Sequence, residues 1–360
     1  MIDRAFWAGK RVFITGHTGF KGGWLSQLLI SLGAIVKGYA LPPPSNPNLF
    51  QAVRLEERLE HVDGDILDSA RLGAELRTFN ADVVFHLAAQ PLVRRSYEQP
   101  KLTYETNVIG TLNLYEAVRA SPTVRVLISV TSDKCYQNNE WVWGYRELDR
   151  MGGYDPYSSS KACAELLTTA YRASFFNRAD YGRTHRVSLS TARAGNVIGG
   201  GDWAQDRLVP DCIRALSDGT KIFIRNPRAV RPWQHVLEPL TGYLVLAKRM
   251  WDEPLEYGDG WNFGPSEGSI GEVEEVVHLV IDAWGEGEYT VTDTPSRHEA
   301  RTLRLDTSKS RDRLHWTPVL SLNEAVRLTA VWYRCYYANT AEVRALTETQ
   351  IESYMRTASS

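Results

Sequence analysis

Cysteine is scarce in this sequence, and the few cysteines are scattered. The 360 residues include four, at positions 135, 163, 212 and 335, and no Cys-x-x-Cys pair. This spacing suggests neither a zinc site nor a disulfide framework, so we expect no metal and free thiols. Free thiols are typical of a reducing compartment.

A leader segment, a membrane span and a surplus of charge are also missing. The opening stretch MIDRAFWAGKRVFI lacks the apolar core and cleavage site of a signal peptide. No apolar run has the length of a membrane-spanning helix. The formal net charge is -2, which argues against nucleic-acid binding through phosphate contacts. We therefore expect a soluble, cytoplasmic protein that binds neither membranes nor nucleic acid.

The first half of the chain alternates short apolar runs with helical stretches. The runs that predict strands are residues 11–15, 34–40, 61–66, 82–89, 125–132 and 186–194. Continuous apolar strands separated by helices indicate a parallel sheet that is covered on both faces. We predict an α/β fold, a Rossmann-type doubly wound parallel sheet with a smaller C-terminal substrate-binding lobe. Ligands of such a sheet bind at the carboxyl ends of its strands.

The alternation loosens after about residue 195. We predict a dinucleotide-binding domain over residues 1–195, with returning segments near 230–265. Residues 196–340 would form a non-contiguous substrate-binding lobe, and residues 341–360 a polar tail. Within this half, Ser321 is followed three residues later by Glu324, which predicts a helix that begins with a capping box.

The stretch TGHTGFKG, residues 15–22, lies between the first predicted strand and the first helix. Its glycines are Gly16, Gly19 and Gly22. Each glycine costs about 0.5–1 kcal/mol in regular structure, so three of them require a reason. One reason is a phosphate, which needs a close backbone approach and the free N–H groups of a helix start. The other is a tight strand-to-helix turn that binds nothing.

Two further stretches carry groups suited to proton transfer. Tyr157 and Lys161 in YDPYSSSK stand four residues apart, so on a helix they share a face. A lysine beside a tyrosine favours the phenolate, which can accept a proton from a sugar hydroxyl. Ser132 and Asp133 in VTSDKCY follow the fifth predicted strand and would project into the crevice. Chance spacing explains the first pair equally simply, and a turn or helix N-cap explains the second.

Together these stretches resemble the extended short-chain dehydrogenase/reductase family. Its pattern Gly-x-x-Gly-x-x-Gly matches TGHTGFKG, and FHLAAQ, TNVIGT and YSSSK match three further elements of the family. Within it the chain looks most like the nucleotide-sugar 4,6-dehydratases, and among those like the branch that acts on CDP-glucose. The resemblance extends over nearly the whole chain. It implies NAD as cofactor, a sugar nucleotide as substrate, and a homodimer or homotetramer formed through helices that include the Tyr-x-x-x-Lys helix.

The resemblance also assigns residues to the cofactor and the substrate. The expected cofactor contacts are Gly16, Thr18, Gly19, Phe20, Gly22, Asp65, Ile66, Ala88, Ala89, Asn107, Tyr157 and Lys161. The expected substrate contacts are Gln90, Arg193, Asn196, Arg207, Arg231 and His298. The arginines are included because a diphosphate attracts guanidinium groups.

The implied reaction has three steps on one sugar. Tyr157 takes the proton of the C4 hydroxyl as C4 is oxidised, water is lost across C5 and C6, and the hydride returns to C6. Asp133 would act as the acid toward the C6 hydroxyl. Many relatives have a glutamate at the next position, whereas this chain has Lys134. Lys134 is therefore either the base at C5 or a group that holds a substrate oxygen or pairs with Asp133.

Two questions stay open in the sequence. The second strand ends near Tyr39 without the carboxylate that identifies NAD, so the fingerprint does not exclude NADP. The substrate could also be GDP-mannose or dTDP-glucose, and a 4-epimerase of the family would share Tyr157 and Lys161. An epimerase has no use for an acid–base pair at 133 and 134. A non-catalytic dinucleotide sensor, in turn, would not need Tyr157.

Overall fold

The computed structural model describes residues 2–292 and 302–358. The strands are β1 (Arg11–Thr15), β2 (Ile35–Ala40), β3 (Glu60–Asp63), β4 (Val83–His86), β5 (Val126–Val130), β6 (Ser188–Ala194), β7 (Asn196–Ile198), β8 (Ile222–Ile224), β9 (Val230–His235), β10 (Gly260–Phe263), β11 (Ile270–Glu272) and β12 (Tyr289–Val291). The α-helices are α1 (Arg4–Trp7), α2 (Phe20–Ser31), α3 (Leu49–Ala52), α4 (Ser69–Phe79), α5 (Val93–Glu98), α6 (Pro100–Tyr104), α7 (Gly110–Arg119), α8 (Pro156–Ser174), α9 (Leu208–Ser217), α10 (Leu237–Asp252), α11 (Val273–Trp284), α12 (Ser308–Leu314), α13 (Leu322–Ala338) and α14 (Val343–Thr357). A π turn, η2 (Glu105–Ile109), joins α6 to α7, and the short 3₁₀ turn η3 (Asp133–Cys135) follows β5.

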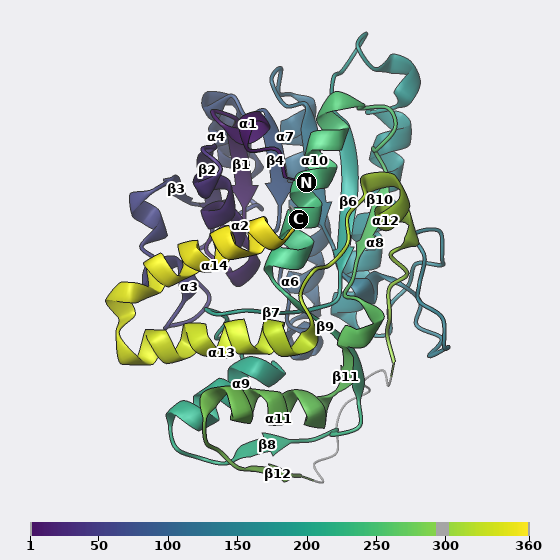
Figure 1. Cartoon of the computed structure of the whole chain (residues 1–360). Coiled ribbons are helices and arrows are strands. Elements are labelled where there is room, and N and C mark those ends of the chain that lie inside the picture. Colours follow the sequence, from purple (N-terminus) through teal and green to yellow (C-terminus); the bar gives the residue numbers. More distant parts are fainter. Residues whose placement is uncertain (1, 293–301, 359–360) are drawn as a thin grey trace.

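The large sheet confirms the predicted strands of the first half. Among the described residues, seven parallel strands lie in the order β10-β6-β5-β4-β1-β2-β3 (Figure 1). β1 lies inside the sheet, with Val12 opposite Val36 of β2 on one side and Val83 of β4 on the other. The first six runs of the sequence supply six of these strands, and β10 adds the seventh.

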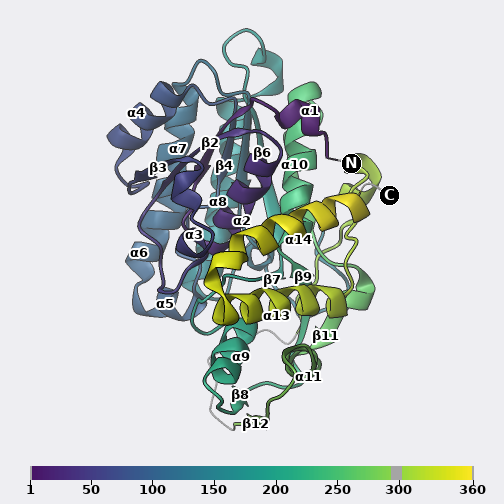
Figure 2. The same cartoon turned by 60° about the vertical axis from the view of Figure 1, so that its left-hand side comes forward.

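Alternate residues of β1 enter different cores. Val12 and Ile14 belong to the core that contains residues of α2 and α10, whereas Phe13 belongs to the core under α4 and α7. Figures 1 and 2 show helices on both sides of the sheet. Full burial of one such side chain contributes about 1.5–3 kcal/mol, so a strand with apolar residues on both faces is stable only between two helix layers. The doubly wound architecture is confirmed.

The second half of the chain contributes smaller pieces. β7, β9 and β11 form a three-stranded sheet, and β8 pairs with β12. The chain then returns from β9 to the large sheet through α10, which packs on β5 and β6. Figure 1 shows α9, α11, β8 and β12 together below the large sheet.

The end of the chain differs from the polar tail expected for residues 341–360. Residues 343–357 are the helix α14, whose Val343, Ile351 and Tyr354 are buried. These residues recur at helical spacing and face α2 and α13, with α14 crossing the molecule in Figure 2. The composition of the segment is polar, but one apolar stripe is sufficient to dock a helix. The capping box of Ser321 and Glu324 at the start of α13 is confirmed.

None of the helices within residues 2–292 and 302–358 is both long enough and apolar enough to cross a bilayer.

Candidate active site

The glycine-rich turn between β1 and α2 forms a tight cradle. Gly16 has a φ of 80°, and a Cβ on it would lie 2.7 Å from the Ala88 nitrogen. A Cβ on Gly22 would lie 2.1 Å from the Gly16 carbonyl oxygen. Gly19 is the N-cap of α2 and offers no side-chain acceptor, which leaves N–H groups of the first turn for a ligand. The turn therefore suits the pyrophosphate of a dinucleotide, because backbone donors and a helix start converge where no side chain intrudes.

A buried hydrogen-bond chain fixes the strand ends beside this cradle. The His86 ring lies 2.7 Å from the Thr15 hydroxyl through Nδ1 and 2.9 Å from the Thr111 hydroxyl through Nε2. The Ala88 nitrogen donates to the Thr15 hydroxyl over 3.3 Å. Burial, and then the charge of Lys161, lowers the pKa of His86 to about 3, so this histidine is neutral. These hydrogen bonds hold the Ala88 backbone against Gly16.

Asn107 and Gln90 shape the loop that follows β4. Asn107, in the π turn η2, accepts a hydrogen bond from the Gln90 nitrogen at 2.8 Å and donates to the Ser160 hydroxyl at 2.9 Å. The Gln90 amide donates to the Leu92 carbonyl and to Thr103, and its oxygen accepts from the Leu92 nitrogen. The polar atoms of the Gln90 side chain are thus engaged within the protein. This differs from the expected substrate contact, and the observed role of Gln90 is to hold the loop.

The predicted proton-transfer residues meet at the carboxyl end of β5. The Ser132 hydroxyl donates to Asp133 over 2.9 Å and lies within hydrogen-bonding reach of the Tyr157 hydroxyl. The Lys134 ammonium is 3.6 Å from the Asp133 carboxylate. Asp133 is buried, whereas about a third of the Lys134 side chain is exposed. The structure therefore brings together all four residues that the sequence analysis placed in this crevice.

The charges around Tyr157 differ from expectation. Lys161 donates to the Val130 carbonyl over 3.3 Å, and burial lowers its pKa to about 8, opposed by the charge of Glu165. Burial raises the pKa of Tyr157 to about 12, and the nearby cation that most opposes this rise is Arg207. Arg207 itself pairs with Asp202 at 2.7 Å. The charge of Arg207 thus also acts on Tyr157, whereas the sequence analysis had assigned this arginine to the diphosphate alone.

Lys21 is a member of the site that sequence reasoning missed. It is the second residue of α2, and its charge interacts with those of Arg207, Asp133, Lys161 and Lys134. Burial, and then Arg207, lowers its pKa to about 8. The signal was present in TGHTGFKG, where a lysine follows the second fingerprint glycine by two residues. Lys21 therefore lies within electrostatic range of three further cations and of Asp133, an arrangement that suits a substrate rich in negative charge.

Arg193 is not placed where the sequence analysis expected it. Its guanidinium is buried against the carboxylate of Glu165 at 2.6 Å and donates to the Tyr136 hydroxyl over 2.6 Å. A guanidinium occupied in this way cannot bind a diphosphate without breaking a buried ion pair. Instead of the expected substrate contact, the structure shows Arg193, in β6, in a buried structural pair with Glu165.

Two of the remaining substrate candidates lie on short strands beside Asp133. A Cβ on Gly195 would be 3.2 Å from both the Asp133 carboxylate and the Pro232 ring, so β9 passes close to the acid. Asn196 of β7 pairs with Trp233 of β9, and Arg231 precedes Pro232. Asn196 and Arg231 remain predicted substrate contacts. His298 lies outside the described residues.

The expected adenosine side of the cofactor site contains few free charges. The Tyr39 hydroxyl donates to the Asp65 carbonyl over 3.0 Å, and the Asp65 carboxylate accepts from the Leu67 nitrogen. Lys37 is 2.6 Å from both Glu60 and Glu75. The remaining cofactor candidates pack around the cradle and the strand ends: Thr18 donates to the Leu41 carbonyl, Phe20 lies against Gly199, Ile66 lies against Gly110, and Ala89 follows Ala88.

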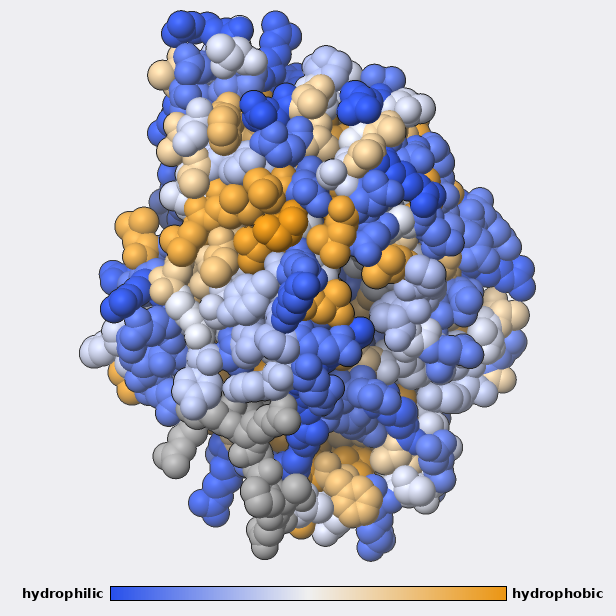
Figure 3. Space-filling model, turned by 180° about the vertical axis from the view of Figure 1, so that it is seen from behind, coloured by the Kyte–Doolittle hydropathy of each residue, from blue (hydrophilic) through white to orange (hydrophobic). Residues whose placement is uncertain are grey.

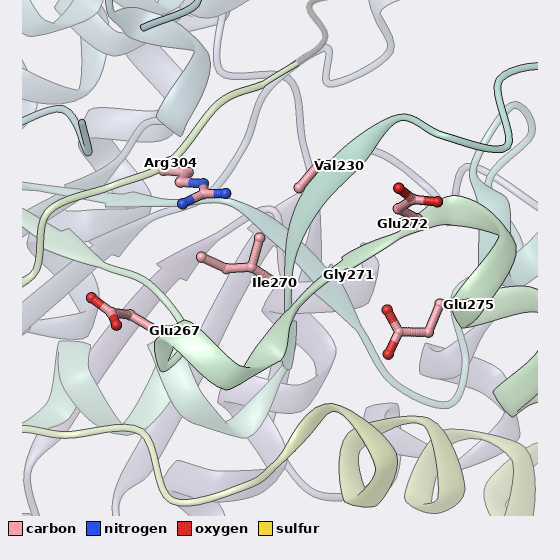
Figure 4. A pocket seen from close by; sticks show the side chains of 7 residues that line it. All are labelled: Val230, Glu267, Ile270, Gly271, Glu272, Glu275 and Arg304. Atoms are coloured by element: carbon pink, nitrogen blue, oxygen red, sulfur yellow. The ribbon is translucent and has the colours of Figure 1, made fainter. Parts of the chain in front are cut away.

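A pocket of about 430 Å³ lies at β11, where Ile270 pairs with Pro232 of β9. Glu267, Glu272, Glu275 and Arg304 are among its lining residues (Figure 4). Three carboxylates make it a poor receptor for a diphosphate, so we assign it no part in the site. Within the described residues no group of three His, Cys, Asp or Glu side chains is arranged to hold a metal ion.

Comparisons with known proteins agree with this geometry. The family described as GDP-mannose 4,6 dehydratase matches residues 13–329. A CDP-glucose 4,6-dehydratase of Salmonella typhimurium is 50% identical over 356 residues, which cover 99% of both chains.

Solved structures of similar fold include two that hold NAD. The dTDP-glucose 4,6-dehydratase DesIV of Streptomyces venezuelae, solved with NAD and TYD, has a TM-score of 0.76 at 24% identity, covering 93% of this chain and 99% of that one. MoeE5 in complex with UDP-glucuronic acid and NAD has a TM-score of 0.74 at 26% identity, covering 90% and 99%.

Proposed function

Because this chain belongs to the GDP-mannose 4,6-dehydratase family, we propose that it is an NAD-dependent dehydratase that converts CDP-glucose to CDP-4-keto-6-deoxyglucose. The observation that carries the choice of substrate is the 50% identity with a CDP-glucose 4,6-dehydratase over the full length of both chains. The chemistry is supported by the group formed by Ser132, Asp133, Lys134 and Tyr157 at the end of β5.

The glycine cradle and the start of α2 would hold the cofactor. Glycine at 16 and 22 lets the turn pack tightly against the Ala88 backbone and on itself, and the start of α2 then offers N–H groups without a side-chain cap, which suits a pyrophosphate. When bound, NAD supplies reversible hydride transfer with the sugar. Lys37 supports NAD over NADP, because Glu60 and Glu75 already neutralise its charge and it is not free for a 2′-phosphate.

Tyr157 would accept the proton of the C4 hydroxyl. With burial raising its pKa to about 12, the phenol needs nearby positive charge to lose its proton at neutral pH. Arg207 lies beside it, and Lys161 is one helical turn along α8. The Ser132 hydroxyl is positioned to hydrogen-bond the C4 oxygen as its proton leaves.

Asp133 and Lys134 would carry out the elimination of water across C5 and C6. Once C4 is a ketone, the C5 hydrogen is acidic, and Lys134 is the group placed to accept it. Asp133, buried beside Ser132 and Gly195, would donate a proton to the departing C6 hydroxyl. For this step Lys134 and Asp133, 3.6 Å apart, would have to start as a neutral amine and a protonated carboxyl. Lys134 would then take the C5 proton while Asp133 gives its own proton to the departing hydroxyl, which leaves as water.

A panel of sugar nucleotides tests this function. The purified protein with NAD should produce the alkaline ultraviolet absorbance of a 4-keto sugar from CDP-glucose, and much less from dTDP-glucose, UDP-glucose or GDP-mannose. Substrate with deuterium at C4 should give product with that deuterium at C6 of the same molecule. A 4-epimerase would instead leave the 6-hydroxyl in place and form the C4 epimer of the substrate, and either that product or a different preferred base would overturn the proposal.

We also propose that the enzyme is a homo-oligomer. α6, η2 and α8 present exposed apolar side chains, namely Tyr104, Ile109, Leu166 and Phe175. Figure 3 shows an apolar patch on the face of the molecule where α8 lies. Contiguous patches of this kind are typical of subunit interfaces. Light scattering should give a dimer or tetramer for the wild type and a smaller species for Leu166→Glu.

The four cysteines are free thiols, which supports a cytoplasmic location.

A further inference from the structure

Three side chains on one face of α8 contact three consecutive residues at the exit of β5. Tyr157, Lys161 and Glu165 are spaced four residues apart, so they line one stripe of the helix. Tyr157 is within reach of Ser132, Lys161 donates to the Val130 carbonyl, and Glu165 accepts from the Thr131 hydroxyl. The first two residues are expected in the catalytic chemistry, whereas nothing so far explains the third.

Glu165 is a fully engaged buried carboxylate. Besides Thr131, it accepts from Thr191 at 2.8 Å and from the Nε and Nη2 of Arg193 at 2.8 and 2.6 Å. The side chains of Glu165 and Arg193 are 2% and 4% exposed. Burial alone would raise the pKa of Glu165, but Arg193 and the hydroxyl donors lower it overall, so the pair stays ionised.

This ion pair holds the segment that carries Ser132, Asp133 and Lys134 from both ends. Before the segment, Thr131 bonds to Glu165 through its hydroxyl and to the Ala192 carbonyl through its nitrogen, over 3.0 Å. After the segment, the Tyr136 hydroxyl accepts from Arg193 and donates to the Asn262 side chain at 2.8 Å.

Stability alone is a weak reason for such a pair. The desolvation of two charges offsets most of their attraction, and apolar residues of similar volume are often as stabilising. Its contacts are instead concentrated on the residues that flank the reactive segment and on the helix that carries Tyr157.

We propose that Glu165 is a positioning residue for the dehydratase: by holding Thr131, and Tyr136 through Arg193, it keeps Ser132 and Asp133 in register with Tyr157. This inference rests on the proposed function, because register matters only if these groups act on one substrate. A misplacement of about 1 Å in reacting groups can reduce turnover by about 100-fold.

Two threonines that donate to the same carboxylate permit a matched test. Thr131→Val and Thr191→Val each remove one hydroxyl donor to Glu165 with little change of shape, but only Thr131 adjoins Ser132. We expect Thr131→Val to lower kcat on CDP-glucose at least about tenfold with KM within about twofold of the wild type. Thr191→Val should keep kcat within about twofold of the wild type. Its melting temperature should fall by about as much as that of Thr131→Val, because each variant loses one hydrogen bond to Glu165. Thr131→Ser, which keeps the donor, should restore most of kcat.

Each result decides the inference. A Thr131→Val enzyme with wild-type kcat, or an equal loss of kcat in Thr191→Val, would reduce Glu165 to a structural role. If Thr131→Val does not fold, Thr131→Ala against Thr131→Ser gives the same comparison of donor absent and donor present. A wild type that is inactive on CDP-glucose would instead refute the proposed function, so the two failures are distinguishable.

Discussion

Adjacent glycines of α2 offer a direct test of the cofactor cradle. A Cβ on Gly22 would lie 2.1 Å from the Gly16 carbonyl oxygen and 2.8 Å from the His17 Cα, both of them backbone atoms. A Cβ on Gly23 would meet the tip of the Leu49 side chain at 2.8 Å. The two substitutions by alanine therefore add the same methyl group one residue apart, one against rigid backbone and one against a side chain that can rotate.

The expected magnitudes follow from this difference. Alanine is favoured over glycine within a helix by about 1 kcal/mol, which applies to both variants. For Gly23→Ala, rotation of Leu49 absorbs the contact, so the free energy of unfolding should change by less than about 1 kcal/mol. For Gly22→Ala, the first turn of α2 must move away from Gly16, at a cost of about 1–3 kcal/mol. That movement displaces the N–H groups that would bind the pyrophosphate, so NAD affinity should fall at least about tenfold, or 1.4 kcal/mol.

The assay is calorimetric titration of NAD into each variant, with thermal unfolding measured in its presence and absence. The rise in melting temperature caused by a bound ligand grows with the logarithm of its affinity, so the NAD-induced rise should be retained in Gly23→Ala and reduced in Gly22→Ala. Wild-type NAD affinity in Gly22→Ala would show that the cofactor does not use this turn. An equal loss in both variants would show that helix propensity or folding, not the cradle, is being measured.

Three further outcomes are expected. Tyr157→Phe should reduce dehydratase turnover by about 100-fold or more at an unchanged melting temperature, the usual scale for removal of a general base; near-normal turnover would exclude Tyr157 from the chemistry. Lys134→Met should still oxidise C4 but stall before elimination, so that absorbance of reduced cofactor accumulates at 340 nm; elimination at the wild-type rate would leave Lys134 without a role at C5. Burial lowers the pKa of His17, His86 and His235 to about 3, and for His17 the neighbouring His61 adds to this. The unfolded chain therefore takes up these protons first, and stability that is complete above about pH 6.5 is lost as the pH falls toward 3, by about 1.4 kcal/mol for each histidine at pH 5.5. Urea midpoints at about pH 7.5 and 5.5 measure this loss, and equal midpoints would contradict it.

The fold was largely predictable because its signals are local. A run such as RVFIT is apolar on both sides, so it is stable only when buried between two helix layers, and this property needs no knowledge of distant residues. The capping box at Ser321 is similarly contained within four residues. The segment 341–360 was interpreted wrongly because its polar average concealed the stripe of Val343, Ile351 and Tyr354, which matters only once α2 and α13 are there to receive it.

The pairing of charged side chains is what could not be predicted from the sequence. The sequence identified Tyr157, Ser132 and Asp133 correctly as neighbours, because each follows a strand end or occupies a set position on a helix. It could not tell which of Arg193 and Arg207 is available to a substrate, because that depends on what lies opposite each guanidinium in the fold. Arg193 pairs with Glu165 of α8, where both side chains are buried, whereas Arg207, although paired with Asp202, stays within electrostatic range of Tyr157. Local spacing therefore determined the sheet, the glycine turn and the reactive group, whereas only the tertiary structure decided which cations remain available to a substrate, because pairing depends on carboxylates that are distant in sequence.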